Sequence, residues 1–214
     1  MAINIKVIAF DLDGVLYDGP SAVFPVAHAL GLGEKFIAIM KENQTKRLTL
    51  EQSIIKGSKI WEGIPVDGTL NPIVESIPLM EGSVETIHEL KERGYIVGCI
   101  SSGVSQFFLE PFQRRLGLDF AYSNVLGELD GKHDGKVHYV MGGPQKAQKA
   151  KEVLEERGLS QENLACIGDG ENDIELFRFA KFSIAFNPEN DRVSEAASVT
   201  VRSKNLRDVL QYFS

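Results

Sequence analysis

Short apolar runs alternate with amphipathic segments along most of the chain. The first run, IKVIAF (residues 5–10), is continuous and rich in β-branched residues, which is typical of a strand buried on both faces. Similar runs follow at residues 95–100, 163–169, 182–186 and 198–203. The segments between these runs have apolar residues at helical spacing; Val84, Ile87 and Leu90, for example, would share one face of a helix. The alternation predicts an α/β fold, a Rossmann-like, doubly wound parallel sheet with right-handed crossovers.

One long segment interrupts this alternation. A crossover needs only about a dozen residues, yet residues 14–80 separate the first predicted strand from the helix that leads into the second. This segment has almost no strand signal and carries helical patterns at 22–32, 33–43 and 49–63. We therefore predict a small helical cap, residues 15–80, inserted after strand 1.

The rest of the chain forms the predicted catalytic core, residues 1–14 and 81–214. Within it, residues 124–140 contain two β-rich runs on either side of DGKHDGK, a pattern most simply explained by a β-hairpin.

Composition narrows the classes of partner. The 214 residues are 43% hydrophobic and 25% charged, as expected of a soluble domain with a sizeable core. The net charge is −7 and no long Lys/Arg run is present, so a nucleic acid is not an expected partner. No apolar stretch reaches the roughly 20 residues that span a bilayer, so no membrane contact is expected either. The sequence leaves the oligomeric state open between monomer and homodimer.

The cysteines and histidines give no sign of a redox or metal site. Cys99 and Cys166 lie in apolar runs and are expected to be small core residues; with no secretory segment near Met1, this predicts a cytoplasmic protein. No pair of histidines has metal-ligand spacing, so we expect all four to be structural or surface residues; they are His28, His88, His133 and His138.

Carboxylates follow two of the predicted strands. Asp11 and Asp13 end the first run, and residues two apart in an extended segment point the same way. Asp169 follows another apolar run within IGDGENDIELF, and Asp173 comes four residues later. Open α/β sheets place their ligands at the carboxyl ends of strands, so these side chains are expected to meet. Mg²⁺ is a hard cation held by one or two carboxylates together with a phosphate, and it suits this set.

Groups suited to a phosphate follow the second strand. ISSG (residues 100–103) is expected to open a helix there, so that Ser101 and Ser102 offer a hydroxyl and backbone N–H groups to an anion. Lys146 is expected to begin the helix that leads into the next strand and to start near the same edge. A carboxylate nucleophile, a neighbouring acid/base, a cation, a lysine and an anion site together fit phosphoryl transfer through an aspartyl-phosphate.

Each of these motifs alone has a structural explanation. Ser101 could be a helix cap, Lys146 a solvated helix residue, and Trp61 either a core or a lid residue. The order of the motifs, at the ends of three successive predicted strands, is what favours a functional site.

The same residues resemble a known family. FDLDGVL, ISSG, Lys146 and GDGEND are similar to the four motifs of the haloacid dehalogenase superfamily of Mg²⁺-dependent phosphohydrolases. The resemblance covers nearly the whole chain and is nearest to its phosphoserine phosphatase-like branch. The 23-residue interval from Lys146 to Asp169 also resembles that branch, which favours Lys146 over the neighbouring lysines.

The resemblance implies a catalytic or metal-binding role for residues of all four motifs. Asp11 would be the nucleophile and Asp13 the general acid/base. Ser101 would bind the transferring phosphoryl group, and Lys146 would neutralise its charge beside Asp11. The implied cofactor is Mg²⁺, held by Asp11, the Asp13 backbone carbonyl and Asp169.

The remaining implied roles concern support of the metal and the phosphate. Asp173 would brace the metal site, Asn172 would lie close to the substrate phosphate, and the backbone at Ser102 and Gly103 would complete the phosphate site.

Departures from the branch concern its substrate. Gly14 and Val15 replace the usual Ser-Thr after the first motif, and Ser102-Gly103 replaces Gly-Gly. Pro20 stands where a cap glutamate would meet the substrate amino group, and Gly57 where an arginine would meet its carboxylate. The predicted substrate is therefore a small phosphorylated metabolite (a phosphomonoester) that need not be phosphoserine. The alternatives are a phosphotransferase or mutase of the same superfamily and a ligand-binding homologue without turnover.

Overall fold

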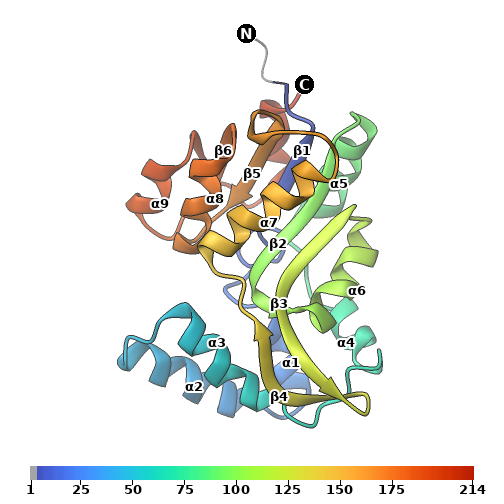
Figure 1. Ribbon diagram of the computed structural model, residues 1–214, viewed down its shortest axis with the longest axis vertical. Coiled ribbons are helices and arrows are strands. Elements are labelled where there is room, and N and C mark those ends of the chain that lie inside the picture. The colour runs from blue at the N-terminus through green and yellow to red at the C-terminus, as the bar shows by residue number, and fades with distance from the viewer. Residues whose placement is uncertain (1–3) are drawn as a thin grey trace.

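A seven-stranded sheet organises the chain. The computed structural model describes residues 4–214, and the strand order is β4-β3-β2-β1-β5-β6-β7 (Figure 1). The strands are β1 (Val7–Phe10), β2 (Ile96–Ser105), β3 (Phe120–Leu129), β4 (Lys132–Tyr139), β5 (Leu164–Gly168), β6 (Phe182–Phe186) and β7 (Val199–Val201). All neighbouring pairs are parallel except β3 and β4, which pair antiparallel as a hairpin. The predicted α/β fold with a largely parallel sheet is confirmed.

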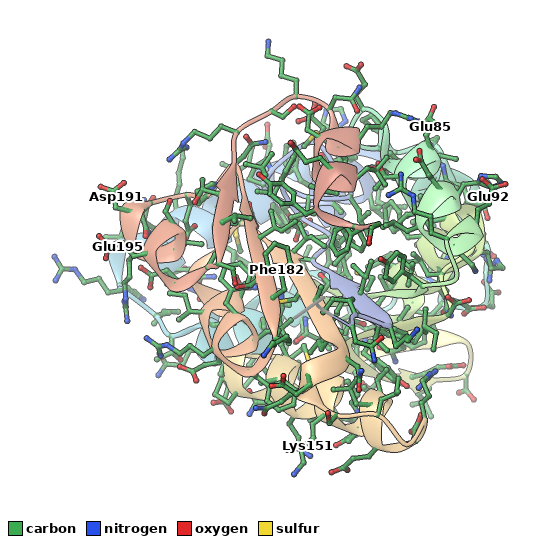
Figure 2. The ribbon with its side chains drawn as sticks, turned by 90° about the horizontal axis from the view of Figure 1, so that it is seen from above. Glu85, Glu92, Lys151, Phe182, Asp191 and Glu195 are labelled. Atoms are coloured by element: carbon green, nitrogen blue, oxygen red, sulfur yellow. The ribbon has the colours of Figure 1, made fainter. Side chains whose placement is uncertain are left out.

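Helices cover both faces of the sheet because the central strands are apolar on both. Ile8 and Phe10 of β1 pack in one hydrophobic cluster, whereas Val7 and Ala9 pack in another. On the first face lie α5 (Ser83–Glu92), α6 (Gln106–Leu116) and the 3₁₀ helix η4 (Leu206–Tyr212). On the second lie α7 (Gly143–Glu155), α8 (Ile174–Phe179) and α9 (Asp191–Ala196). In Figure 2 the labelled Glu85 and Glu92 of α5 and Lys151 of α7 accordingly lie on opposite sides of the sheet.

Helices connect β1 to α5. They are α1 (Val23–Ala29), α2 (Gly33–Thr45), α3 (Leu50–Ser58), η1 (Lys59–Trp61) and α4 (Asn71–Glu75). In Figure 1, α1, α2 and α3 lie beyond the carboxyl ends of the central strands, and β3 and β4 extend beside them. The buried His133 of β4 links α3 to the hairpin of β3 and β4. One of its ring nitrogens lies 3.1 Å from the carbonyl oxygen of Ser58 in α3, and the other lies 2.7 Å from the carbonyl oxygen of Gly127 in β3. Division of the chain into a core and a 15–80 cap remains a prediction.

The structure corrects three details. β2 continues to Ser105, with a register shift against β3 after Ile100, so α6 begins at Gln106 and ISSG does not open a helix. Val84 is 49% exposed, because α5 turns Ser83, Thr86, Ile87 and Leu90 inward instead. Residues 206–212 form the 3₁₀ helix η4, where the amphipathic pattern NLRDVLQYF (residues 205–213) predicts an α-helix.

The prediction for the two cysteines agrees with the structure. Cys99 and Cys166 are free and fully buried in β2 and β5. Among residues 4–214, no helix combines the length and the apolar character needed to cross a membrane.

A short 3₁₀ helix lies on either side of β5 in the sequence. The two are η2 (Gln161–Asn163) before the strand and η3 (Glu171–Asp173) after the loop that follows it.

Candidate active site

Three adjacent strands carry the predicted motifs. β1 lies between β2 and β5, and Asp11 directly follows β1 as Asp169 directly follows β5. The Asp11 amide donates to the Ile167 carbonyl at 2.8 Å, so its backbone is still held in the register of the sheet. The carboxyl ends of parallel strands meet at one edge, and this edge brings together residues that are distant in the sequence.

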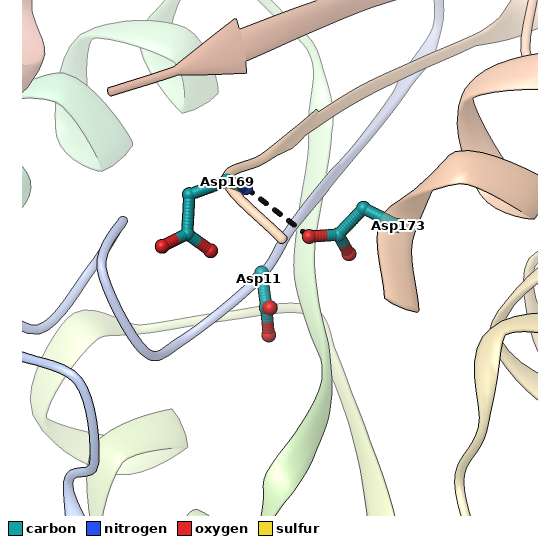
Figure 3. A group of neighbouring side chains, drawn as sticks. All are labelled: Asp11, Asp169 and Asp173. Carbon is teal, nitrogen blue, oxygen red and sulfur yellow. Dashed lines mark hydrogen bonds between the residues drawn. The ribbon is translucent and has the colours of Figure 1, made fainter. Parts of the chain in front are cut away.

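Three carboxylates gather at this edge. One oxygen each from Asp11, Asp169 and Asp173 lies within 4.8 Å of the others, as Figure 3 shows. The Asp173 carboxylate is held by the loop after β5, because its Oδ2 accepts hydrogen bonds from the backbone N–H groups of Asp169 (3.1 Å, the dashed line) and Gly170 (3.2 Å). The loop after β5 therefore holds Asp173 and presents Asp169 beside Asp11.

Lys146 balances part of this charge from within the protein. It is 0% exposed in the first turn of α7, and its Nζ lies 2.9 Å from Asp11 Oδ2 and 2.7 Å from Asp173 Oδ1. Burial acts to lower the pKa of Lys146, but attraction to Asp11 and Asp173 outweighs it, so the pKa is raised. The ammonium is therefore charged, and the alternative of a solvated helix residue is excluded.

One lysine does not compensate all of these carboxylates. Burial, with repulsion from Asp173 and Asp13, raises the pKa of Asp11 to about 7 despite the attraction of Lys146. Burial and repulsion from Asp11 raise the pKa of Asp169 to about 8. Negative charge is thus disfavoured at this edge in the protein alone. A bound cation would relieve it.

Asp13 stands between the carboxylate cluster and the helices of residues 23–61. Its Oδ1 accepts a 2.6 Å hydrogen bond from the Ala22 amide, just before α1. Its Oδ2 packs against Gly103, where a Cβ would come within 1.7 Å of that oxygen. Burial raises the pKa of Asp13 to about 6, so this carboxyl changes protonation state near neutral pH.

The serine segment of β2 differs in detail from its expected geometry. Ser101 is fully buried and its Oγ accepts a 3.2 Å hydrogen bond from the Gly103 amide. Ser102 and Gly103 line the cavity above the carboxylates, and the buried Ser102 Oγ has no hydrogen-bond partner among the described residues. Because β2 continues to Ser105, any anion bound here would meet the irregular end of a strand and not a helix N-terminus.

Two structural supports of the site escaped the sequence reasoning. Gly14 has φ +70°, and a Cβ there would lie 2.0 Å from Asp169 Oδ2, so the residue after the first motif must be small and left-handed. Asn124 is buried in β3; its amide nitrogen donates to the Ser102 and Val104 carbonyls and its oxygen accepts from the Met141 amide, all at 2.8 Å. From the sequence, Gly14 is recognisable only as a departure from the family pattern. Nothing in the sequence marks Asn124.

The donor set fits Mg²⁺. Magnesium prefers oxygen ligands and is usually bound through one or two carboxylates, keeping positions open for water and phosphate oxygens. Asp11 and Asp169 can supply those carboxylates, since both Asp173 oxygens already accept hydrogen bonds from Lys146, Asp169 and Gly170. Asp11, Asp169 and Asp173 are the one carboxylate, cysteine or histidine cluster with metal-ligand geometry within residues 4–214.

A cavity of 680 Å³, which we call the carboxylate cavity, opens above this cluster. Asp11, Asp13, Asp169 and Asn172 all line it. Pro20, which precedes the helices of residues 23–61, also lines it. The candidate residues of the four motifs thus lie around one cavity. Most of them line it, and the others are buried next to the residues that do; these are Ser101, Lys146 and Asp173.

The histidines take no part in this cluster. His28, His88 and His138 are exposed and His133 is a buried structural residue, as expected.

Known proteins resemble the chain over nearly its whole length. A model of the haloacid dehalogenase-like hydrolase family matches residues 5–181. A phosphoserine phosphatase of Methanocaldococcus jannaschii is 32% identical over 208 residues, which cover 97% of each chain. Another, of Wolinella succinogenes, is 32% identical and covers 97% of this chain and 100% of that one.

Solved structures agree with the sequences. A phospho-aspartyl intermediate analogue of phosphoserine phosphatase superposes with a TM-score of 0.82 at 31% identity and covers 99% of this chain and 100% of that one. A substrate-bound phosphoserine phosphatase complex superposes with a TM-score of 0.83 at 30% identity, covering 98% and 99%. The predicted similarity to phosphoserine phosphatases and the predicted hydrolase class are both confirmed. The chain belongs to the haloacid dehalogenase-like hydrolase family.

Proposed function

We propose that this protein is a Mg²⁺-dependent phosphatase that hydrolyses a small phosphomonoester through an aspartyl-phosphate on Asp11. One observation carries the proposal: Asp11 lies buried at a strand end, 2.9 Å from a buried lysine and beside a second carboxylate with which it can share a cation. The names of the similar proteins, phosphoserine phosphatases, support the same class of reaction.

The metal would be held by Asp11, Asp169 and the backbone carbonyl of Asp13. When bound, Mg²⁺ offsets the repulsion between Asp11 and an anionic phosphoryl group and stabilises the charge that develops on its oxygens. Asp173 would support the metal site without binding the ion, because its oxygens accept hydrogen bonds from the Asp169 and Gly170 amides and the Lys146 ammonium. Asp13 would contribute its main chain to the metal and keep its side chain for proton transfer.

In the first step an oxygen of Asp11 attacks the phosphorus, and the bond from phosphorus to the ester oxygen breaks. Asp13 gives its proton to that oxygen, so the leaving group departs as a neutral alcohol. The pKa of Asp13, raised to about 6 by burial, keeps a usable fraction of the acid form near neutral pH. Lys146 stays beside Asp11 and compensates the negative charge of the reacting groups.

In the second step Asp13, now a carboxylate, takes a proton from water. The water oxygen attacks the phosphorus, the bond between phosphorus and Asp11 breaks, and inorganic phosphate leaves. One residue therefore serves as acid and then as base. Ser101, Ser102 and Gly103 on one side and Asn172 on the other are our proposed ligands for the phosphoryl oxygens.

Hydrolysis and transfer differ in the acceptor. A phosphotransferase or mutase would pass the phosphoryl group to a second hydroxyl, whereas a phosphatase releases phosphate in buffer without one.

The proposal includes a cytoplasmic location, which the two free, buried cysteines favour.

The test is phosphate release from p-nitrophenyl phosphate with Mg²⁺ and no added acceptor. Wild type should release phosphate, and Asp11→Asn should lose at least about 1,000-fold in kcat because it removes the nucleophile. Asp18→Asn, an exposed carboxylate in the same segment, is the matched control and should retain activity. Wild-type turnover by Asp11→Asn would refute the mechanism, and absence of turnover in wild type would favour a ligand-binding homologue.

A further inference from the structure

A second cavity, of 290 Å³, continues from the carboxylate cavity between the core and the helices of residues 23–61. We call it the apolar chamber. Its wall includes Val23, Phe36, Ile54, Trp61, Phe108 and Leu126.

Aromatic rings form much of the chamber wall. The ring of Trp61 packs edge-on against that of Phe108 in α6, with the ring centroids 5.2 Å apart. The ring of Phe36 in α2 also lies beside Trp61, at a centroid distance of 6.4 Å. All three side chains are at least nine-tenths buried. Such a wall gains free energy by excluding water from apolar surface, and it offers ring faces to an apolar guest.

Charge is almost absent from the chamber. Of the residues between 4 and 214 that line it, Asp13, at the end nearest the catalytic carboxylates, is the one with a charged side chain. Pro20 and Gly57 occupy places in the wall where longer side chains could have supplied charge. An ammonium or a carboxylate group entering here would lose its hydration without an ion partner, which costs several kcal/mol for each ion.

Apart from Asp13, the polar groups of the chamber wall are uncharged. Ser102 and Ser105 are each 3% exposed, and their Oγ atoms find no hydrogen-bond partner in the described part of the chain. The Asn124 side chain is already occupied by the main chain on both sides. Ser21, Ser53 and Ser58 also line the chamber. Neutral hydroxyls can satisfy an ester oxygen or another neutral polar atom of a guest, but they cannot replace the ion partners of a zwitterion.

The chamber and the carboxylate cavity share part of their walls. Asp13, Pro20, Ser102 and Gly103 line both. The leaving group of an ester whose phosphorus lies at Asp11 must begin beside Asp13, which protonates it, and Asp13 stands at the entrance to the chamber.

We propose that the apolar chamber binds the leaving group, and that the preferred substrates are phosphomonoesters of uncharged, predominantly apolar alcohols. This inference rests on the proposed phosphatase function and specifies its substrate class. It assigns Trp61, Phe36 and Phe108 to substrate selection, and it excludes phosphoserine as the preferred substrate even though the similar proteins are named for it.

A matched pair of esters tests the preference. Isobutyl phosphate has the same O–CH2–CH branch point as phosphoserine, with methyl groups in place of the ammonium and the carboxylate. With Mg²⁺, kcat/KM should be at least about 100-fold higher for isobutyl phosphate than for phosphoserine, because only the latter brings unpaired charge into the chamber. Equal values, or a preference for phosphoserine, overturn the inference and leave the phosphatase proposal intact. Turnover of p-nitrophenyl phosphate with no turnover of either ester overturns the inference alone, whereas no turnover of any of the three esters overturns the phosphatase proposal and this inference with it.

A positive charge placed in the chamber wall should narrow or reverse the preference for isobutyl phosphate over phosphoserine. Apart from its chain neighbours and the adjacent backbone of α3, no atom of the described chain lies within 4 Å of a Cβ built at Gly57, so Gly57→Arg has open space there and adds a cation to the chamber wall. It should lower kcat/KM for isobutyl phosphate at least about tenfold and narrow or reverse the ratio to phosphoserine. Ile55→Arg places the same charge on the 46%-exposed neighbour of α3 and should change neither value. Equal effects of the two variants contradict the assigned position of the leaving group.

Binding gives a readout that needs neither turnover nor a variant. Trp61 is the only tryptophan in the sequence, so its fluorescence reports on the chamber wall alone. Isobutylphosphonate, which lacks the ester oxygen and cannot be hydrolysed at it, should shift or quench the Trp61 emission of the Mg²⁺-loaded protein in a saturable way. Inorganic phosphate, which reaches only the carboxylate cavity, should leave the emission unchanged. An identical response to both ligands overturns the inference.

Discussion

Replacement of Lys146 by methionine tests how the buried charges of the site are balanced. Methionine keeps an unbranched side chain of similar length but removes the ammonium that lies 2.9 Å from Asp11 and 2.7 Å from Asp173. Both carboxylates would then be buried next to each other without a cation. We expect this variant to be strongly destabilised in the absence of metal, and more so at pH 8 than at pH 5.

The magnitude follows from the burial of the three groups. Lys146, Asp11 and Asp173 are at most 5% exposed, and removal of one partner of a buried ion pair costs about 3–5 kcal/mol because the other charge is left uncompensated. At pH 5 Asp11 is largely protonated, since burial raises its pKa to about 7, so one of the two contacts carries less charge. The loss at pH 5 should be smaller by at least about 1 kcal/mol, the equivalent of one pKa unit.

Urea unfolding in EDTA, followed by circular dichroism at both pH values, measures the effect. Lys151→Met is the matched control on the same helix, because Lys151 is 52% exposed and its pair with Glu155 is a surface pair worth at most about 1 kcal/mol. A loss for Lys146→Met no larger than that of Lys151→Met, or one that is the same at both pH values, would refute the charge balance described above.

Three further predictions concern pH and the supports of the site. The metal-free protein should lose stability as pH rises from 4 to 8: the pKa of Asp11 rises from 3.8 unfolded to about 7 folded, so the folded state binds more protons in this window, and Asp11 alone accounts for about 4 kcal/mol. Saturating Mg²⁺ should flatten this dependence in thermal melts, and a metal-free protein most stable at pH 8 would contradict it. Gly14→Ala should weaken Mg²⁺ affinity at least about tenfold by calorimetry, because the added methyl displaces the Asp169 carboxylate; wild-type affinity would show that the approach is not needed. Asn124→Ala should cost about 2–4 kcal/mol in urea unfolding, since it leaves buried main-chain groups of Ser102, Val104 and Met141 without partners, and a loss under about 1 kcal/mol would be inconsistent with that network.

The fold could be predicted from the sequence because its signals are local. The five core strands are short runs with little polar interruption, and in β1 adjacent residues alternate between the two hydrophobic clusters. The places where prediction failed depend on tertiary contacts. β2 runs on to Ser105 because Asn124 ties the Ser102–Val104 main chain to β3, a contact that no spacing along the chain reveals. Val84 fits the helical period but lies at the edge of the buried stripe.

The candidate site was predictable in its residues and not in its surroundings. Chain order placed Asp11 and Asp169 at strand ends, and a parallel sheet then brings such residues together. The sequence could not show that Lys146 is completely buried, or that Gly14 makes room for Asp169. The apolar chamber was equally hidden, because its wall combines residues of α2, α3, α6 and β3 that meet only in the folded protein.

The central claim is that Asp11 carries the phosphoryl group, and chemical trapping tests it most directly. Wild-type protein is mixed with Mg²⁺ and isobutyl phosphate or p-nitrophenyl phosphate, quenched in acid during turnover, and treated with borohydride, which reduces an aspartyl-phosphate to homoserine. Peptide mass spectrometry should then find homoserine at position 11, dependent on substrate, and unchanged aspartate at positions 13 and 169. Reduction at another aspartate, or none at any position while phosphate is being released, would contradict the account.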